Sequence, residues 1–245
     1  HFHGQEIRHL RPGGSAFELD ARRLPAVLAD NAQLHAAPEG GLWVPTTLGL
    51  VRISNEPAQW VSHRRGLPDE GVFLVYPDAE GNLWCGGVGL YRVQSGRWFQ
   101  AYDMRDGLPG NVVWAVARVG GRLLVGTQVG LAELKDGQFR PVEGTRGFNV
   151  SQILEHPDGS AYVVARGGGL LRLAPGATAA VRVPEVVKQP SRVALGQEGR
   201  LYVNGGQTGL LELVPKPGGG FQVHPVEVPK SPTGGAGVNR VVVDR

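Results

Sequence analysis

The sequence predicts an all-β protein built from repeated four-stranded sheets, and three observations carry this prediction. Five times a short apolar run leads into a Gly-Leu step; these steps begin at positions 49, 89, 130, 169 and 209, so that successive steps lie 39 to 41 residues apart. Each step follows a short apolar run such as Leu83-Trp84-Cys85, which has the composition of a β-strand. Glycine and proline separate these runs, as turns require. Repeats of about 40 residues with several short strands each are typical of a β-propeller.

Residues 72–107 show the strand pattern of one repeat. The apolar runs 72–76 and 83–85 are separated by a turn segment at 77–82, and Gly86-Gly87 ends the second run. Residues 90–93 form the third strand, and Ser95-Gly96 leads into the fourth, 98–102. Gly107-Leu108-Pro109 then begins the next repeat, as Gly66-Leu67-Pro68 does one period earlier. Four strands per period correspond to one propeller blade.

Apolar residues at fixed positions of the repeat are expected to form the core, because neighbouring sheets pack face to face. The second strand of each repeat contains a large residue, and an apolar residue lies nine positions before it. These apolar residues are Leu34, Val75, Ala115, Ile153 and Val193. Aromatic residues recur in the fourth strand at Phe17, Trp60, Trp98, Phe139 and Phe221, with Val181 filling the remaining place. Trp84 is predicted to be structural, and Cys85, which stands where other repeats have valine, to be a small buried residue.

We expect residues 1–245 to form a single propeller domain of about six repeats. The sequence begins partway through a repeat, because residues 7–17 align with the third and fourth strands at 90–99. At the other end, residues 238–244 match the first strand of a repeat. Two arrangements stay open: the last strand pairs with the first segment and closes a six-bladed ring, or further repeats cover the edges of a longer array. The chain starts at His1 without an initiator methionine or a signal-like segment, which suggests a processed or excised piece.

Composition and motifs narrow the classes of function. The net charge is only +3, and the arginines are dispersed, so nucleic-acid binding is not expected. No run of 18 apolar residues is present, so the domain itself is not expected to be embedded in a membrane. The seven histidines share no metal-binding motif, and no paired carboxylates or nucleophile elbow are visible. We therefore expect no catalytic residues, no metal and no cofactor.

The motif at residues 78–92, Asp-x-x-Gly-Asn-Leu-Trp-x-Gly-x-x-Gly-Leu-x-Arg, resembles the two-component regulator propeller repeat. Five clear copies and one degraded copy cover nearly the whole chain, with departures such as Pro45 in place of glycine and tyrosine in place of tryptophan at 162 and 202. Proteins of this family form the periplasmic sensor region of bacterial hybrid histidine kinases and of some diguanylate cyclases. The resemblance implies a periplasmic ligand-sensing domain that works by binding, without catalysis, and leaves the kinase or cyclase output unidentified.

The resemblance also indicates which partners to expect. They are a small molecule or a glycan, or a periplasmic protein, and homodimerisation is left open. Binding would then change the relative placement of two propeller-bearing chains and so control an output domain across the membrane. Two alternatives from other classes remain. One is a propeller lyase or hydrolase of the streptogramin-lyase type, and the other is a scaffold for protein–protein interaction.

Recognition groups of a receptor are expected in loops near the channel mouth, where one repeat departs from the others. In the aligned repeats Arg166 stands where Thr46 and Thr127 stand, next to three glycines, and its guanidinium can bind a carboxylate or sulfate through two hydrogen bonds. Asn204, beside Gly205-Gly206, can present amide donors. We predict Arg166, Asn204, Thr46 and Thr127 as ligand-binding residues. The alternatives are a solvated loop charge for Arg166 and strand-end caps for the threonines.

Overall fold

The computed structural model describes residues 2–3, 6–9, 18–23, 32, 34–37, 40–54, 59–61, 71–94, 98–186, 190–204 and 209–227. By the density of internal contacts the chain divides into two compact units, His1–Ala101 and Tyr102–Arg245. Regular structure in the described part is almost entirely antiparallel β-sheet. Its helical segments are two three-residue 3-10 turns, η2 (Met104–Asp106) and η3 (Gln197–Gly199), and neither could cross a membrane.

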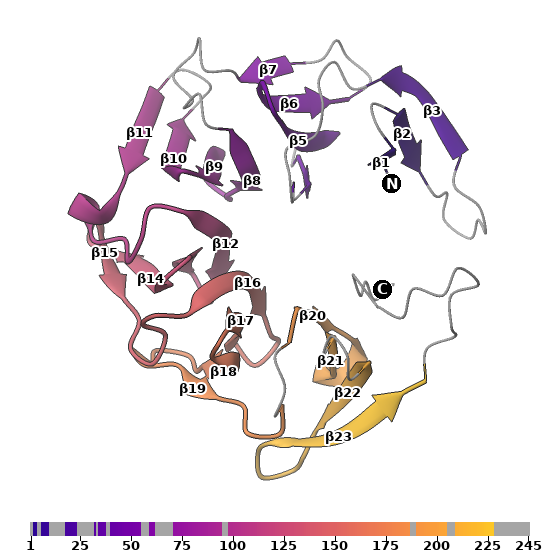
Figure 1. Cartoon of the computed structure of the whole chain (residues 1–245), viewed down its shortest axis with the longest axis vertical. Coiled ribbons are helices and arrows are strands. Elements are labelled where there is room, and N and C mark those ends of the chain that lie inside the picture. The colour runs from indigo at the N-terminus through magenta and orange to yellow at the C-terminus, as the bar shows by residue number, and fades with distance from the viewer. Residues whose placement is uncertain are drawn as a thin grey trace. The chain divides into compact units, whose positions relative to one another are not determined.

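Three sheets are built from the first part of the chain (Figure 1). The first has three strands, β1 (Phe2–His3), β2 (Glu6–His9) and β3 (Glu18–Arg23). The second has four, β4 (His35–Ala36), β5 (Leu42–Thr46), β6 (Gly49–Ile53) and β7 (Gln59–Val61). The third has β8 (Val72–Pro77), β9 (Asn82–Gly87), β10 (Gly89–Gln94) and β11 (Trp98–Tyr102).

Three four-stranded sheets make up the second unit. The first contains β12 (Val113–Val119), β13 (Arg122–Thr127), β14 (Gly130–Lys135) and β15 (Gln138–Pro141). The second contains β16 (Asn149–Glu155), β17 (Ala161–Arg166), β18 (Gly169–Leu173) and β19 (Val181–Arg182). The third contains β20 (Arg192–Leu195), β21 (Leu201–Asn204), β22 (Leu210–Pro215) and β23 (Phe221–Val226).

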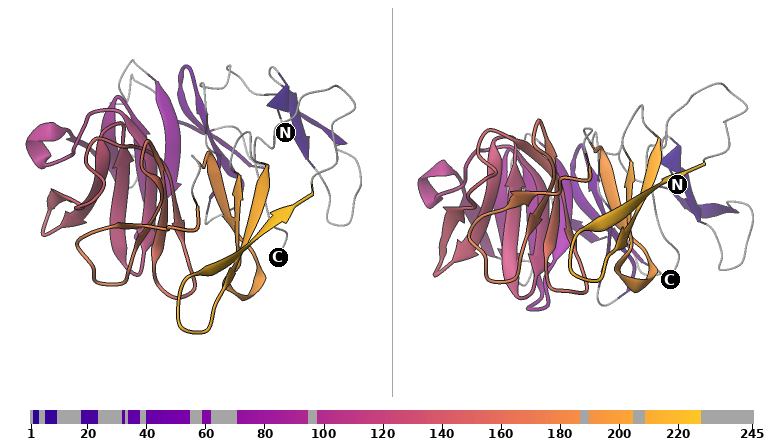
Figure 2. Two further views of the ribbon diagram at one scale, coloured as in Figure 1. Left: turned by 60° about the horizontal axis from the view of Figure 1, so that its bottom comes forward. Right: turned by 90° about the horizontal axis from the view of Figure 1, so that it is seen from below.

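Strand order within each sheet follows the chain, and consecutive strands are joined as antiparallel hairpins. In three sheets the first strand packs on strands of the preceding sheet of the same unit: β8 contacts β4, β5 and β6, β16 contacts β12, β13 and β14, and β20 contacts β16 and β17. Figure 2 shows the twist within one such sheet, where yellow β23 crosses the orange strands at an angle. These features are those of a β-propeller and confirm the predicted fold class. The number of blades stays a prediction.

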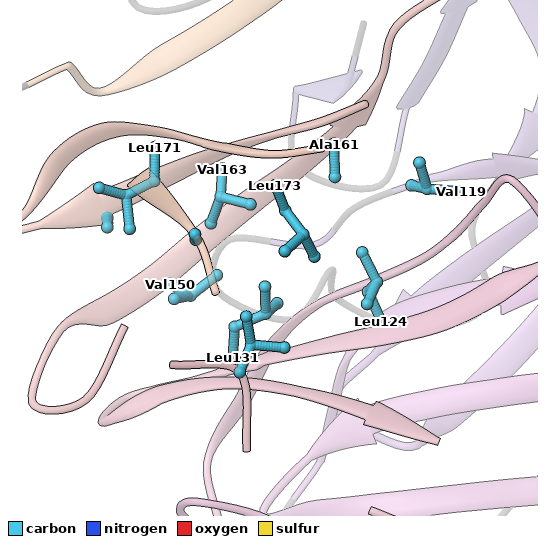
Figure 3. Packing of buried hydrophobic residues seen from close by; sticks show 11 residues of the cluster. Val119, Leu124, Leu131, Val150, Ala161, Val163, Leu171 and Leu173 are labelled. Carbon is cyan, nitrogen blue, oxygen red and sulfur yellow. The ribbon is translucent and has the colours of Figure 1, made fainter. Parts of the chain in front are cut away.

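Apolar side chains from neighbouring sheets of the second unit form a continuous core. Val119, Leu124 and Leu131 of the β12–β15 sheet pack against Val150 and Leu173 of the β16–β19 sheet, and all five are almost fully buried (Figure 3). Strands that are covered on both faces need apolar residues on both, which explains the unbroken apolar runs in the sequence. The repeat period therefore encodes the packing of one sheet on the next.

The Asp-x-x-Gly-Asn-Leu-Trp motif forms a hydrogen-bonded turn around one buried carboxylate. Asp78 is 3% exposed and accepts hydrogen bonds from the backbone N–H of Asn82 at 2.8 Å and from Trp84 Nε1 at 2.8 Å. The side-chain amide of Asn82 donates to both carboxylate oxygens. Trp84 is 1% exposed, and the Arg92 guanidinium lies 5.5 Å from its ring centroid. The structural role predicted for Trp84 is confirmed.

Most core positions predicted from the repeat are confirmed. Val75, Ala115, Val193, Phe139 and Phe221 are buried, and the remaining described positions, Leu34, Ile153 and Trp60, are partly buried against core clusters. Phe17 and the side chain of Trp98 lie outside the described part.

The prediction for Val181 is wrong. Its side chain is 62% exposed, because β19 is only two residues long and the chain buries Ala180 and Val183 on either side of it.

Cys85 is fully buried, as predicted, and burial raises the pKa of its thiol to about 12. Because only the thiolate reacts with alkylating reagents, we expect iodoacetamide to leave Cys85 unmodified in the folded protein at about pH 8. Full modification is expected in guanidinium chloride, as measured by intact mass. Rapid modification of the folded protein would contradict the packing around this strand.

Candidate functional site

Thr46 and Thr127 occupy equivalent places at the ends of β5 and β13, where the second strand of a sheet turns into the third. The Thr46 hydroxyl donates to the Gly49 carbonyl oxygen at 2.7 Å and accepts from the Leu48 N–H at 3.2 Å. Thr127 makes the same pair of bonds with Gly130 and Val129, at 3.0 and 3.3 Å. Both side chains are buried and serve their own turns. A ligand role for these threonines stays a prediction.

Strand register corrects the alignment that placed Arg166 with the two threonines. Ala165 lies opposite Gly169, just as Thr127 lies opposite Gly130, so Arg166 stands one residue further along. The turn between β17 and β18 is one residue longer than the turn between β13 and β14, and Arg166 is exposed at its start. Asn204 pairs with Leu210 at the end of β21 and is 2% exposed. The ligand role of Arg166 and Asn204 stays a prediction.

A charged cleft of about 660 Å³ lies at the opposite end of the β16–β19 sheet, next to the turn between its first and second strands. It is formed together with the β20–β23 sheet, both within the second unit. We call it the charged cleft; its lining includes His156, Asp158, Tyr162, Arg172, Arg182, Glu185, Glu198, Gly199, Lys216 and Phe221. A concave site with several convergent polar groups is the usual form of a small-molecule site.

His156 stands in its repeat where Asp78 stands in its own. The two turns share their backbone hydrogen bonds, from His156 N to Ser160 O and from Asp78 N to Asn82 O, both at 2.9 Å. His156 is 8% exposed, with Nδ1 2.8 Å from Asp158 Oδ1 and Nε2 2.9 Å from the Gly199 carbonyl oxygen. The imidazole therefore links this turn to the next sheet. Sequence reasoning missed the site, and the substitution of histidine for the motif aspartate was its signal.

Asp158 and Tyr162 have fixed protonation states at neutral pH. Partial burial of Asp158 acts to raise its pKa, but hydrogen bonds from the Ser160 N–H, His156 and Arg172 outweigh burial and lower the pKa below its ordinary value. Burial raises the pKa of Tyr162 to about 12. The cleft therefore presents a carboxylate paired with Arg172 beside a neutral phenol.

Two further contacts shape the cleft. The Glu185 carboxylate accepts a hydrogen bond from the Phe221 N–H at 2.8 Å, which ties the segment after β19 to the start of β23. The ring of Tyr162 meets those of His156 and Phe221 edge-on, with centroids 5.3 and 5.9 Å apart. Among the described residues, no group of three His, Cys, Asp or Glu side chains is placed to hold a metal ion. The arrangement offers fixed donors and acceptors around an aromatic base.

No family model matches this chain, and the comparison with curated proteins also found no match. Several solved structures share its fold. The extracellular domain of a proposed hybrid two component system from B. thetaiotaomicron matches with a TM-score of 0.64 at 18% identity, over 90% of this chain and 33% of that one. A catalytically inactive virginiamycin B lyase from Staphylococcus aureus with quinupristin gives 0.63 at 13% identity, over 80% and 70%. YCF48 bound to a D1 peptide gives 0.60 at 17% identity, over 84% and 71%.

At these identities the likeness establishes the fold alone. The matching structures include extracellular domains of the signalling class that the repeat motif predicted, and this chain spans about a third of the length of each. They also include a lyase and a peptide-binding protein, so one fold carries several functions.

Proposed function

We propose that this chain is an extracytoplasmic ligand-sensing domain of a bacterial signal receptor, located in the periplasm, and that it works by binding. The observation that carries this proposal is the charged cleft, on a fold shared with extracellular domains of hybrid two component systems. The ligand is a small polar molecule or a glycan. Its binding changes the placement of two receptor chains and so controls an output domain.

The chemistry of the cleft favours binding of a polyhydroxylated ligand. Asp158 and Arg172 are held by mutual hydrogen bonding, and Lys216 is exposed on the other wall. Such fixed acceptors and donors suit the alternating hydroxyl groups of a sugar, while Tyr162 and Phe221 provide an apolar base. Both ring nitrogens of His156 already contact polar partners, so the imidazole serves as a structural link.

A lyase or hydrolase is the second candidate, and the TM-score of 0.63 with virginiamycin B lyase favours it. Catalysis would require a group that moves a proton at neutral pH. The lowered pKa of Asp158 and the raised pKa of Tyr162 place both groups far from that range. Incubating the chain with quinupristin and following its mass is the direct test, since turnover would overturn a role in binding alone.

The test of binding is a thermal-shift screen of the chain with mono- and oligosaccharides and small carboxylates, followed by calorimetry. We expect Lys216→Met to weaken binding of a cleft ligand roughly threefold to tenfold, because one exposed charge-assisted contact is lost. Lys135→Met is the matched control. Lys135 lies at the corresponding turn between the third and fourth strands of the β12–β15 sheet and does not line the cleft. If Lys216→Met and Lys135→Met weaken ligand binding equally, the charged cleft is not the ligand site.

A further inference from the structure

Three arginines without a carboxylate partner among the described residues surround the β17–β18 hairpin. Arg166 ends β17, Arg146 lies between β15 and β16, and Arg182 ends β19. All three are exposed. The guanidinium of Arg182 lies against the hairpin, since a Cβ at Gly169 would come within 3.1 Å of Arg182 Nε. We call these residues the arginine rim.

Backbone register places Arg166 at one end of the sheet, close to the segment that contains Arg146, and the side chain of Arg182 reaches this end at Gly169. Arg166 is the partner of Asn149 in the β16–β17 ladder. The ring of Phe148 covers the glycines after Arg166, and a Cβ at Gly168 would come within 2.6 Å of Phe148 Cδ2. Arg146 precedes this phenylalanine by two residues. An extended ligand roughly 10 Å long can therefore span Arg146 and Arg166.

An apolar pocket of about 440 Å³ adjoins Arg146. Its walls are mainly apolar, and the lining residues are Pro109, Val129, Gly130, Leu131, Pro141, Val142, Glu143, Thr145, Arg146 and Gly147. The Thr145 hydroxyl is already used, because it donates to the Val142 carbonyl oxygen and accepts from the Leu131 N–H. Val129 keeps 37% of its surface exposed. The site thus combines an apolar pocket, which Arg146 and Glu143 adjoin, with two further exposed arginines around the neighbouring hairpin.

We propose that the arginine rim and this pocket bind an acidic peptide segment of a protein partner, with an apolar side chain of the peptide seated in the pocket. Exposed guanidinium groups pair with carboxylates, and buried apolar anchors supply most of the affinity of such contacts. A sulfated glycan would match the rim and leave the pocket unfilled, so the observations favour a peptide. Arg182 also lines the charged cleft, whereas Arg146, Arg166 and the apolar pocket do not. The proposal depends on Arg146, Arg166 and the pocket, and it holds whether or not the cleft binds a ligand.

The test measures binding of a blocked pentapeptide, with two glutamates on each side of a phenylalanine, to the 245-residue chain by fluorescence anisotropy. We expect the double variant Arg146→Ala/Arg166→Ala to weaken binding on the order of tenfold. The control Lys135→Ala/Arg140→Ala removes two exposed cations elsewhere on the second unit and should bind as the parent does. Val129→Glu should weaken binding comparably, because it places a like charge at the pocket.

Replacing the phenylalanine of the peptide by serine should also lower the affinity, since the pocket then stays empty. The proposal is overturned if the parent does not bind the acidic peptide at millimolar concentration, or if the double variant binds it unchanged. Equal affinity of the serine peptide would overturn the role of the pocket. Binding of a heparin-derived oligosaccharide in place of the peptide would overturn the choice of partner.

Discussion

Replacing Trp84 with alanine is expected to lower the free energy of unfolding by about 3–5 kcal/mol. The indole is 1% exposed, so its removal leaves a cavity that the surrounding strands cannot fill. The same change removes one donor to the buried Asp78 carboxylate. In a protein of this size the loss corresponds to a melting temperature lower by roughly 10 °C. Urea unfolding followed by tryptophan fluorescence measures it.

Phenylalanine at the same position separates the hydrogen bond from the cavity. Trp84→Phe keeps most of the apolar volume and loses the Nε1–H bond to a charged acceptor, which is worth about 1.5–3 kcal/mol. Trp43 is the matched control, because it holds the same place one repeat earlier and its buried Nε1 has no acceptor among the described residues. Trp43→Phe should therefore cost clearly less than Trp84→Phe. Equal costs would show that the bond to Asp78 adds nothing to stability.

The fold was predictable because its signals are local and recur. Strand order follows from hairpin turns, and the repeat period fixes which apolar residues meet between sheets, as the burial of Val75, Ala115 and Val193 shows. The exception, Val181, lies in a two-residue strand, where too few ladder bonds exist to impose alternation. A one-residue difference in turn length likewise displaced Arg166 in the alignment.

The candidate sites were harder to predict because they join residues that are far apart in the sequence. Arg166 and its glycines stood out as a departure from the repeat, whereas the link between His156 and Gly199 spans 43 positions and two sheets. The apolar pocket combines residues from three turns of the chain, each unremarkable by itself. Period analysis finds positions that repeat, and a site made from unlike positions of neighbouring repeats gives no periodic signal.

Gln152 carries the second large effect that we expect, because its side chain joins two sheets of the second unit. Its Nε2 donates to the Val193 carbonyl oxygen at 2.7 Å, and its Oε1 accepts from the Val193 N–H at 3.0 Å. Val193 is 2% exposed, so both backbone groups depend on this amide. Gln152→Met keeps the length of the side chain and leaves both groups unpaired, at an expected cost of about 2–4 kcal/mol. Gln128→Met, which removes a single bond to the Val112 N–H, should cost about half as much.

Gln152→Glu adds a pH signature that a simple packing defect would lack. The carboxylate can still accept from the Val193 N–H but faces the Val193 carbonyl oxygen without a proton, which raises the pKa of the new carboxyl in the folded state. Because this pKa is raised in the folded state, the protonated carboxyl stabilises the folded protein at low pH, and this stabilisation is lost as the pH rises through the folded-state pKa. The free energy of unfolding of the variant should therefore approach that of the parent as the pH is lowered from about 7 to about 5. A difference from the parent that stays constant over this range would mean that Gln152 supports the junction through packing, and that the two hydrogen bonds do not hold the sheets together.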